Sequence, residues 1–265
     1  MTSTVGIIGH SERGPVNDPL MIVRWGQFII KFGSFSKAKT LAHGVHGFFN
    51  NGGKRCYVVN VAEDEDGKLD VESGLKALDE IDEIEYVVVP GQTDTEVHEM
   101  LLDHCRKHED RFAILDLIGE IEEEKEAVEE EETDTGEEET GEEETEEEEE
   151  PKGIYALPEL EDREHGVYLF PWILVKDPIG KHDDPRESYV NIPVSGHVAG
   201  LYASAEEASH DPPHDRKVEG AVSITFKVTD QVQRALNEKG IECLRFHPKE
   251  LIAIGSHKIF YDSVI

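Results

Sequence analysis

The chain has 265 residues, of which 37% are hydrophobic, so it can enclose a core within one or two domains. Its 59 acidic residues against 26 Lys and Arg give a formal net charge of −33. This argues against nucleic-acid binding, because phosphate backbones require basic surfaces. No run of about 18 apolar residues is present, so the sequence predicts no membrane span, and its first residues do not resemble a signal peptide.

The three cysteines, Cys56, Cys105 and Cys243, are few, odd in number and widely spaced. This pattern favours reduced thiols in a cytoplasm over a disulfide framework. Because no two of them form a CxxC pair, we expect no zinc site.

The first half of the sequence alternates between strand and helix patterns. Apolar, β-branched runs predict strands at 3–9, 55–61, 85–90 and 111–117. Helical spacing places Ile22, Trp25, Ile29 and Phe32 on one helix that ends at Gly33. Further helices are expected over 41–49, 70–84 and 93–108. The alternation predicts an α/β fold, a layered, mostly parallel sheet with flanking helices.

An acidic segment interrupts this pattern. Residues 119–150 contain 21 acidic residues and one lysine, which leaves −13 for the rest of the chain. Like charges repel and have nothing to bury, so we expect a disordered surface loop inserted between regions 1–118 and 151–265. A solvating role is favoured, and the alternative is a loop that recruits a basic partner or divalent cations.

After the insert, 166–175 reads as an apolar strand interrupted by Pro171, and 195–203 as the start of a helix. The segment 218–228 is apolar and β-branched. A short helix is expected at 230–239, capped by Thr229 or Asp230 and ended by Gly240. Closing strands follow at 241–246 and 251–254.

Two enzymatic motifs were tested on the segment from Gly6 to Gly14 (GIIGHSERG). Its glycines lie at offsets of zero, three and eight, whereas a dinucleotide fingerprint needs zero, two and five. A nucleophile elbow around Ser11 also fails, because Arg13 occupies the position that needs glycine. A hydrolase that uses Ser11 is therefore disfavoured.

Histidine pairs provide weak metal signals. His43 and His46 lie three apart on a predicted helix, and His210 and His214 flank two prolines, which excludes a shared helical face. Neither pair has the general-base Glu of a zincin, so we interpret them as a helix-face pair and an exposed loop. The segment 182–186 (HDDPR) reads as a turn, and no phosphate-binding GxxxxGK[ST] loop is present.

Several segments in a fixed order carry more information than any single motif. They are GHSERGPVNDP (9–19), WGQFIIKFGSF (25–35), LAHGVHGFFNNGGKRCYVVNV (41–61), VVVPG (87–91), FAILD (112–116), YLFPWI (168–173), PVSGHVAGLYA (193–203), and Leu236-Asn237, Gly240-Ile241 and Leu244-Arg245. Together they resemble the contractile phage tail sheath family, which includes the sheaths of related contractile injection particles. The large aromatic side chains and tight Asn-Gly turns suit a building block.

The resemblance implies a structural subunit that assembles in stacked six-fold rings around an inner tube. The partners that it implies are further copies of this chain, other sheath subunits, and tube and baseplate proteins. It also implies assembly in the cytoplasm, followed by a place in a virion or tail-like particle. We expect no enzyme, and no catalytic, cofactor-binding or metal-binding residue. His197 is the one candidate acid or base, and we favour a packed or capping role for it.

The family's subunits usually carry an N-terminal arm and a C-terminal, tube-facing domain with a second arm. This sequence is expected to lack both arms and that domain, which leaves three alternatives: a natural short form, a second chain that supplies the rest, or a sequence that is cut short. The alternative function is a soluble α/β binding module whose acidic loop recruits a basic partner or divalent cations.

Overall fold

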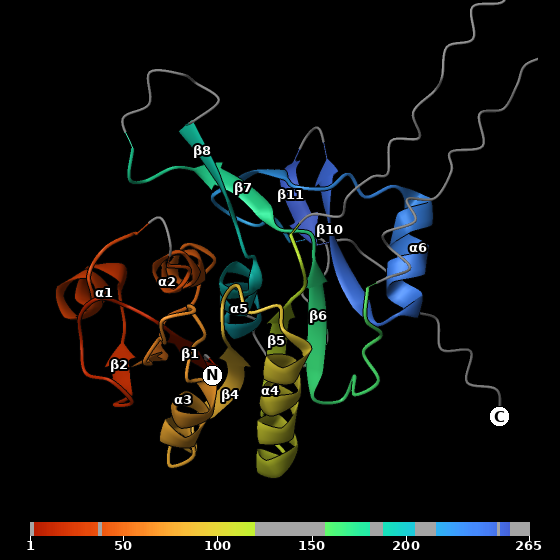
Figure 1. Ribbon diagram of the computed structural model, residues 1–265. Helices are drawn as coiled ribbons and strands as arrows, with labels where there is room; N and C mark the ends of the chain where they lie inside the picture. The colour runs from red at the N-terminus through yellow and green to blue at the C-terminus, as the bar shows by residue number, and fades with distance from the viewer. Residues whose placement is uncertain are drawn as a thin grey trace, which may run out of the picture.

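The computed structural model describes residues 3–36, 39–119, 157–180, 188–204, 216–247 and 250–254, in which strands and helices alternate along the chain (Figure 1). The strands are β1 (Thr4–Gly9), β2 (Leu20–Ile22), β3 (Cys56–Asn60), β4 (Ile84–Val88), β5 (Phe112–Asp116), β6 (Gly166–Phe170), β7 (Ile173–Lys176), β8 (Tyr189–Ile192), β9 (Ala221–Ile224), β10 (Ile241–His247) and β11 (Glu250–Ile254). The helices are α1 (Trp25–Phe32), α2 (Leu41–Asn50), α3 (Val71–Leu78), α4 (Thr95–His108), α5 (Ser195–Ala203) and α6 (Asp230–Glu238).

Eight of these strands form one sheet in the order β11-β10-β6-β5-β4-β1-β3-β2. Neighbours from β10 to β3 are parallel, whereas β11 and β2 pair antiparallel at the two edges. The central strands are nearly continuous apolar runs because helices cover both of their faces. The predicted α/β class and the four strands expected before the insert are confirmed.

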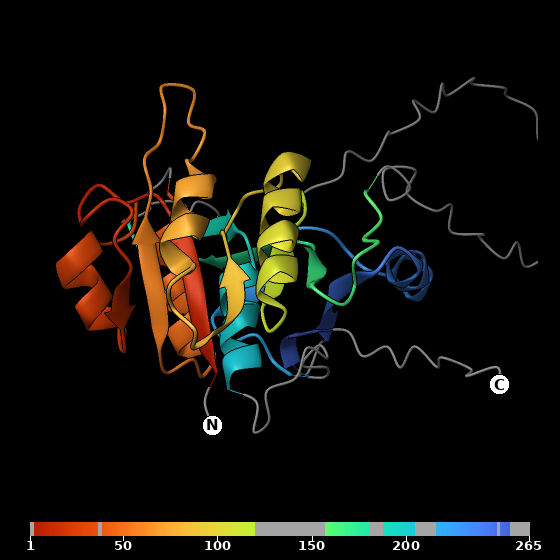
Figure 2. The ribbon, with the colours of Figure 1, turned by 90° about the horizontal axis from the view of Figure 1, so that it is seen from below.

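Helices lie on both faces of this sheet, which makes three layers (Figure 2). Successive side chains of a strand point to opposite faces, so Ile7 packs into a core with α1, α2 and α5, while Ile8 packs into a second core with α3, α4 and α6. Burial on both faces stabilises the sheet through the removal of apolar area from water.

The expected strand over 166–175 is two strands that belong to two sheets. It breaks at Pro171, which has no N–H for a ladder hydrogen bond. The indole N–H of Trp172 instead donates to the Leu117 carbonyl at 2.8 Å. Beyond this break, β7 lies at the centre of an antiparallel sheet, β8-β7-β9. The sequence did not predict β8, because this strand has only four residues, two of which are exposed, and lacks a long apolar run.

Helices α2 and α5 cross at very short range through glycine. A Cβ added to Gly196 would lie 2.3 Å from the Cα of Gly44, which is backbone that cannot turn aside. All nine residues of α5 are buried, which confirms the predicted helix and explains why it carries no polar stripe.

Some predicted boundaries are wrong. Ile22 lies in β2, not in the helix, because α1 starts at Trp25, although Gly33 does end that helix with a φ of 102°. The helix expected over 70–84 stops at Leu78, since Ile84 already belongs to β4. No helix within the described ranges is long and apolar enough to span a membrane. The acidic segment 120–150 lies outside them, so its disorder and the division of the chain around it remain predictions.

Candidate functional site

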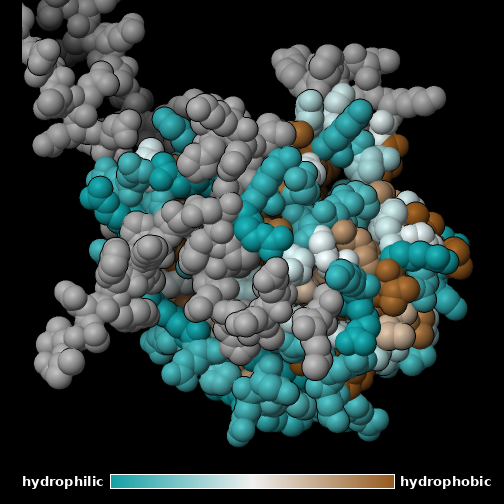
Figure 3. All heavy atoms as spheres, turned by 180° about the vertical axis from the view of Figure 1, so that it is seen from behind, coloured by the Kyte–Doolittle hydropathy of each residue, from teal (hydrophilic) through white to brown (hydrophobic). Residues whose placement is uncertain are grey.

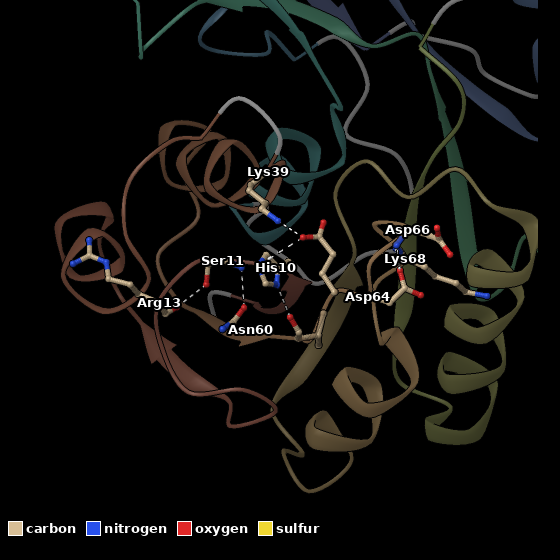
Figure 4. A network of polar contacts seen from close by, with 10 residues as sticks. His10, Ser11, Arg13, Lys39, Asn60, Asp64, Asp66 and Lys68 are labelled. Carbon is tan, nitrogen blue, oxygen red and sulfur yellow. Dashed lines mark hydrogen bonds and ion pairs between the residues drawn. The ribbon is translucent and has the colours of Figure 1, made fainter.

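The carboxyl end of β1 opens on a cavity of about 540 Å³ (Figure 4). In open α/β sheets, ligands bind at the carboxyl ends of the strands, at the point where the strand order reverses. In this sheet that point is β1, because the next two long strands along the chain, β3 and β4, lie on opposite sides of it. His10, Ser11, Arg13 and Lys39 line this cavity together with aromatic side chains of α1. It is therefore the first place to test for enzymatic chemistry.

Ser11 is held as a turn residue. Its Oγ donates to the Arg13 carbonyl at 2.8 Å, and its backbone N–H donates to Asn60 Oδ1 at 2.8 Å. The neighbouring His10 places Nδ1 2.9 Å from the Val61 carbonyl and Nε2 3.8 Å from Glu63 (Figure 4). A nucleophilic serine needs a base within hydrogen-bond reach, and this imidazole is bonded elsewhere.

Lys39, the cation on the opposite wall of this cavity, forms an ion pair with Glu63 (Figure 4). Its charge is thus neutralised within the protein. The loop after β3 is itself ordered by Asp64, whose Oδ1 accepts the N–H groups of Asp66 at 3.0 Å and Lys68 at 2.8 Å. These contacts tie the β1 and β3 loops to the start of α2, which is a structural task.

A buried carboxylate at the end of β5 anchors α5. Asp116 Oδ1 accepts the backbone N–H groups of Val194 at 3.0 Å and Ser195 at 2.9 Å, and Oδ2 accepts the Ser195 hydroxyl and the Gly91 N–H. Burial raises the pKa of Asp116, against the opposing effect of these hydrogen bonds. The negative charge at the helix N-terminus is favourable. The sequence analysis missed this role, because the two segments are far apart in the chain.

The structure brings His197 of α5 against His43 and His46 of α2. They line a cavity of about 220 Å³, and His197 Nδ1 is buried without a hydrogen-bond partner. Burial and the neighbouring histidines lower the pKa of His197 to about 3 and that of His43 to about 4. The ligand atoms of this cluster are not close enough together to hold a metal ion. Their lowered pKa values keep these imidazoles neutral near pH 7, and a packing role for them stays a prediction.

Asp79, His104 and His108 form the one group of described residues whose ligand atoms are close enough for a metal ion. The chemistry of the group favours ion pairs instead. Arg111 donates to His104 Nε2 at 2.6 Å, so the other nitrogen of that ring carries the proton and faces Asp79. Lys107 also lies 2.7 Å from Asp79, where a cation would be repelled.

The remaining sequence candidates do not add a site. Cys56, Cys105 and Cys243 are buried and unpaired, and burial raises the pKa of Cys105 and Cys243 to about 12, so their thiols are unreactive. His210, His214 and the turn 182–186 lie outside the described residues.

Comparison with solved structures identifies the architecture. The helical sheath protein of the anti-feeding prophage, in its contracted state, has a TM-score of 0.64 and 18% identity over 97% of this chain and 62% of its own. The contracted sheath complex of the PVC extracellular contractile injection system gives 0.62 and 20% over 96% and 60%. A sheath tail protein from Listeria innocua gives 0.60 and 10% over 96% and 68%.

The chain has the fold of contractile tail sheath proteins. No family model and no curated protein sequence matches it. The chain spans about three-fifths of the length of the anti-feeding prophage and PVC proteins. The segments that resembled the family in the sequence therefore belong to a fold that these sheath proteins share.

Proposed function

We propose that this protein is a structural subunit of a contractile tail or injection-particle sheath, which self-assembles in stacked rings around an inner tube. The observation that carries the proposal is the match of 97% of the chain to a sheath subunit at a TM-score of 0.64. Its proposed partners are further copies, other sheath subunits, and tube and baseplate proteins. Assembly takes place in the cytoplasm, before the subunit joins the particle.

The proposal includes a non-enzymatic role, with no catalytic, cofactor-binding or metal-binding residue. The partners of Ser11 and of the Asp79 cluster support it, since each polar group is used to hold the fold together. A Ser11→Ala variant should accordingly assemble like the wild type.

Negative-stain electron microscopy tests the sheath role. The purified protein is examined alone and mixed with any sheath and tube proteins that are encoded beside it. We expect rings, tubes or decorated sheaths. Single particles in every mixture would contradict the proposal and favour the alternative, a binding module that works through its acidic loop. Deletion of 120–150 should leave sheath assembly intact, whereas it should abolish partner binding if the alternative is right.

A further inference from the structure

The charges of the first hundred residues are segregated along the chain. Residues 13–55 contain seven Lys and Arg and a single Asp, whereas residues 62–110 contain 17 acidic and four basic residues. The first stretch forms β2, α1 and α2 at one edge of the sheet, and the second forms α3 and α4 on one face. A chain with a net charge of −33 therefore presents a distinct basic region.

The basic region is also the main exposed apolar surface of the described residues. Val16, Met21, Val23 and Ile30 are 55%, 46%, 51% and 75% exposed. Figure 3 shows hydrophobic side chains gathered at this edge of the molecule, over β2 and α1. We call these four residues, with Arg24 and Lys31, the edge patch. An apolar patch of this kind marks an interaction surface.

A partner of the edge patch would contact its side chains and would not pair with the backbone of β2 as an added strand. The Gln27 amide of α1 donates to the Met21 carbonyl at 3.2 Å and accepts the Val23 N–H at 3.0 Å. The Met21 carbonyl of β2 and the Val23 N–H just after this strand are thereby satisfied by a side chain, which disfavours the addition of a strand from a neighbour. Arg24 and Lys31 are exposed, and neither has a carboxylate within 4 Å among the described residues.

The acidic region contains a surface that complements the edge patch. A groove of about 390 Å³ lies between the loop after β3 and helices α3 and α4. Its floor includes Leu69 and Met100, and its rim carries Asp64, Asp70 and Glu72. The one cation on this rim, Lys68, is paired with Glu96 at 3.1 Å. An apolar floor with an acidic rim matches an apolar patch with a basic rim.

We propose that the edge patch of one copy docks in the α3–α4 groove of a second copy, with Ile30 against the apolar floor and Arg24 and Lys31 against the acidic rim. The inference rests on the proposed sheath role, because it supplies a contact between subunits. The two surfaces differ, so the contact is heterologous and repeats head to tail, which generates rings or helical stacks.

Cysteine cross-linking tests the contact, since the three native thiols are buried. Ile30→Cys is mixed with a size-tagged Glu72→Cys variant and oxidised during assembly. We expect a mixed disulfide dimer, and no dimer from either variant alone. The matched control replaces the groove residue with Glu238→Cys, an exposed position on α6. Cross-linking of Ile30→Cys to itself indicates a two-fold contact and overturns the proposal, as does a mixed yield no higher than the control.

Charge exchange provides a second readout. Lys31→Glu and Glu72→Lys should each weaken self-association by about tenfold, and their equimolar mixture should restore it, because each variant then complements the other. If the wild type assembles and neither variant weakens self-association, the docking geometry is overturned and the sheath role stands. Failure of the wild type to associate with itself overturns the docking proposal alone, and failure with sheath and tube proteins as well overturns both.

Discussion

The two faces of the main sheet use histidine in opposite ways. On the α2–α5 face, His43 and His197 are buried in an apolar contact. On the α3–α4 face, His104 and His108 approach Asp79 in an ion-pair network that also includes Lys107. The sequence predicted the three helices that carry these histidines, α2, α5 and α4.

The histidines of the two faces differ because the neighbouring elements offer them different hydrogen-bond and ion-pair partners. Glycines let α2 and α5 approach so closely that His197 packs against Gly47, and its Nδ1 is buried without a hydrogen-bond partner. At the end of α3, partial burial alone would raise the pKa of Asp79, but hydrogen bonds from Lys107 and His108 of α4 outweigh this effect and lower that pKa. Spacing along a helix therefore shows which residues share a face, and only the packed neighbour decides their charge.

Removal of the Asp116 carboxylate, which anchors α5, is expected to cause the largest loss in the free energy of unfolding. Asp116→Ala leaves the buried N–H groups of Val194 and Ser195 and the partly buried N–H of Gly91 without an acceptor. Each such group costs about 1–3 kcal/mol, so we expect a loss of about 3–5 kcal/mol in the free energy of unfolding. Urea denaturation measures this loss. Asp110→Ala, an exposed position just before β5, is the control and should stay within about 0.5 kcal/mol of the wild type.

A smaller loss of stability is expected from a methyl group added where α2 and α5 cross. Gly196→Ala places a Cβ against the Gly44 backbone, and this overpacking should cost about 1–3 kcal/mol. The matched control is Gly26→Ala in α1, where nothing lies within 4 Å and alanine should stabilise the helix by about 1 kcal/mol. Equal melting temperatures for the two variants would show that the helices do not cross as closely as described.

Low pH should reduce the stability of the folded protein through the buried histidines between α2 and α5. Above pH 6.5 these groups are neutral in both states and contribute nothing. As the pH falls below 6.5, the unfolded chain binds protons that folded His43 and His197 bind only near pH 4 and pH 3, so stability declines. His197→Leu should reduce the decline between pH 7 and pH 5, measured by urea denaturation at each pH. An unchanged decline in this variant would contradict the assignment.

The smallest effect is expected on the α3–α4 side. Asp79→Asn removes a partly exposed ion-pair partner of Lys107 and His108, which should cost no more than about 1 kcal/mol at pH 7. Because the pKa of Asp79 is lowered by folding, the stabilisation is present above pH 3.8 and is lost as the pH falls through the lowered pKa. Added salt should reduce the difference in the free energy of unfolding between Asp79→Asn and the wild type, since these ion pairs face solvent.

Local pattern was sufficient for most of the elements, although the short strands β2 and β8 were missed. The apolar runs at 85–90 and 111–117 became β4 and β5, because strands buried on both faces must be apolar throughout. The helix over 195–203 and its small residues were equally visible in the sequence. The ordered segments that resemble the tail sheath family led to the fold that comparison with solved structures confirms.

Tertiary structure decided everything that depends on contacts between distant segments. Asp116 meets the start of α5 across 78 positions of the chain, and no periodicity signals that contact. Likewise, the run 166–175 is divided between two sheets because Pro171 and Trp172 turn the chain, although its composition reads as one strand. Sequence specifies which surfaces each element can bury. The partner that covers each surface follows only from the packing of the whole chain.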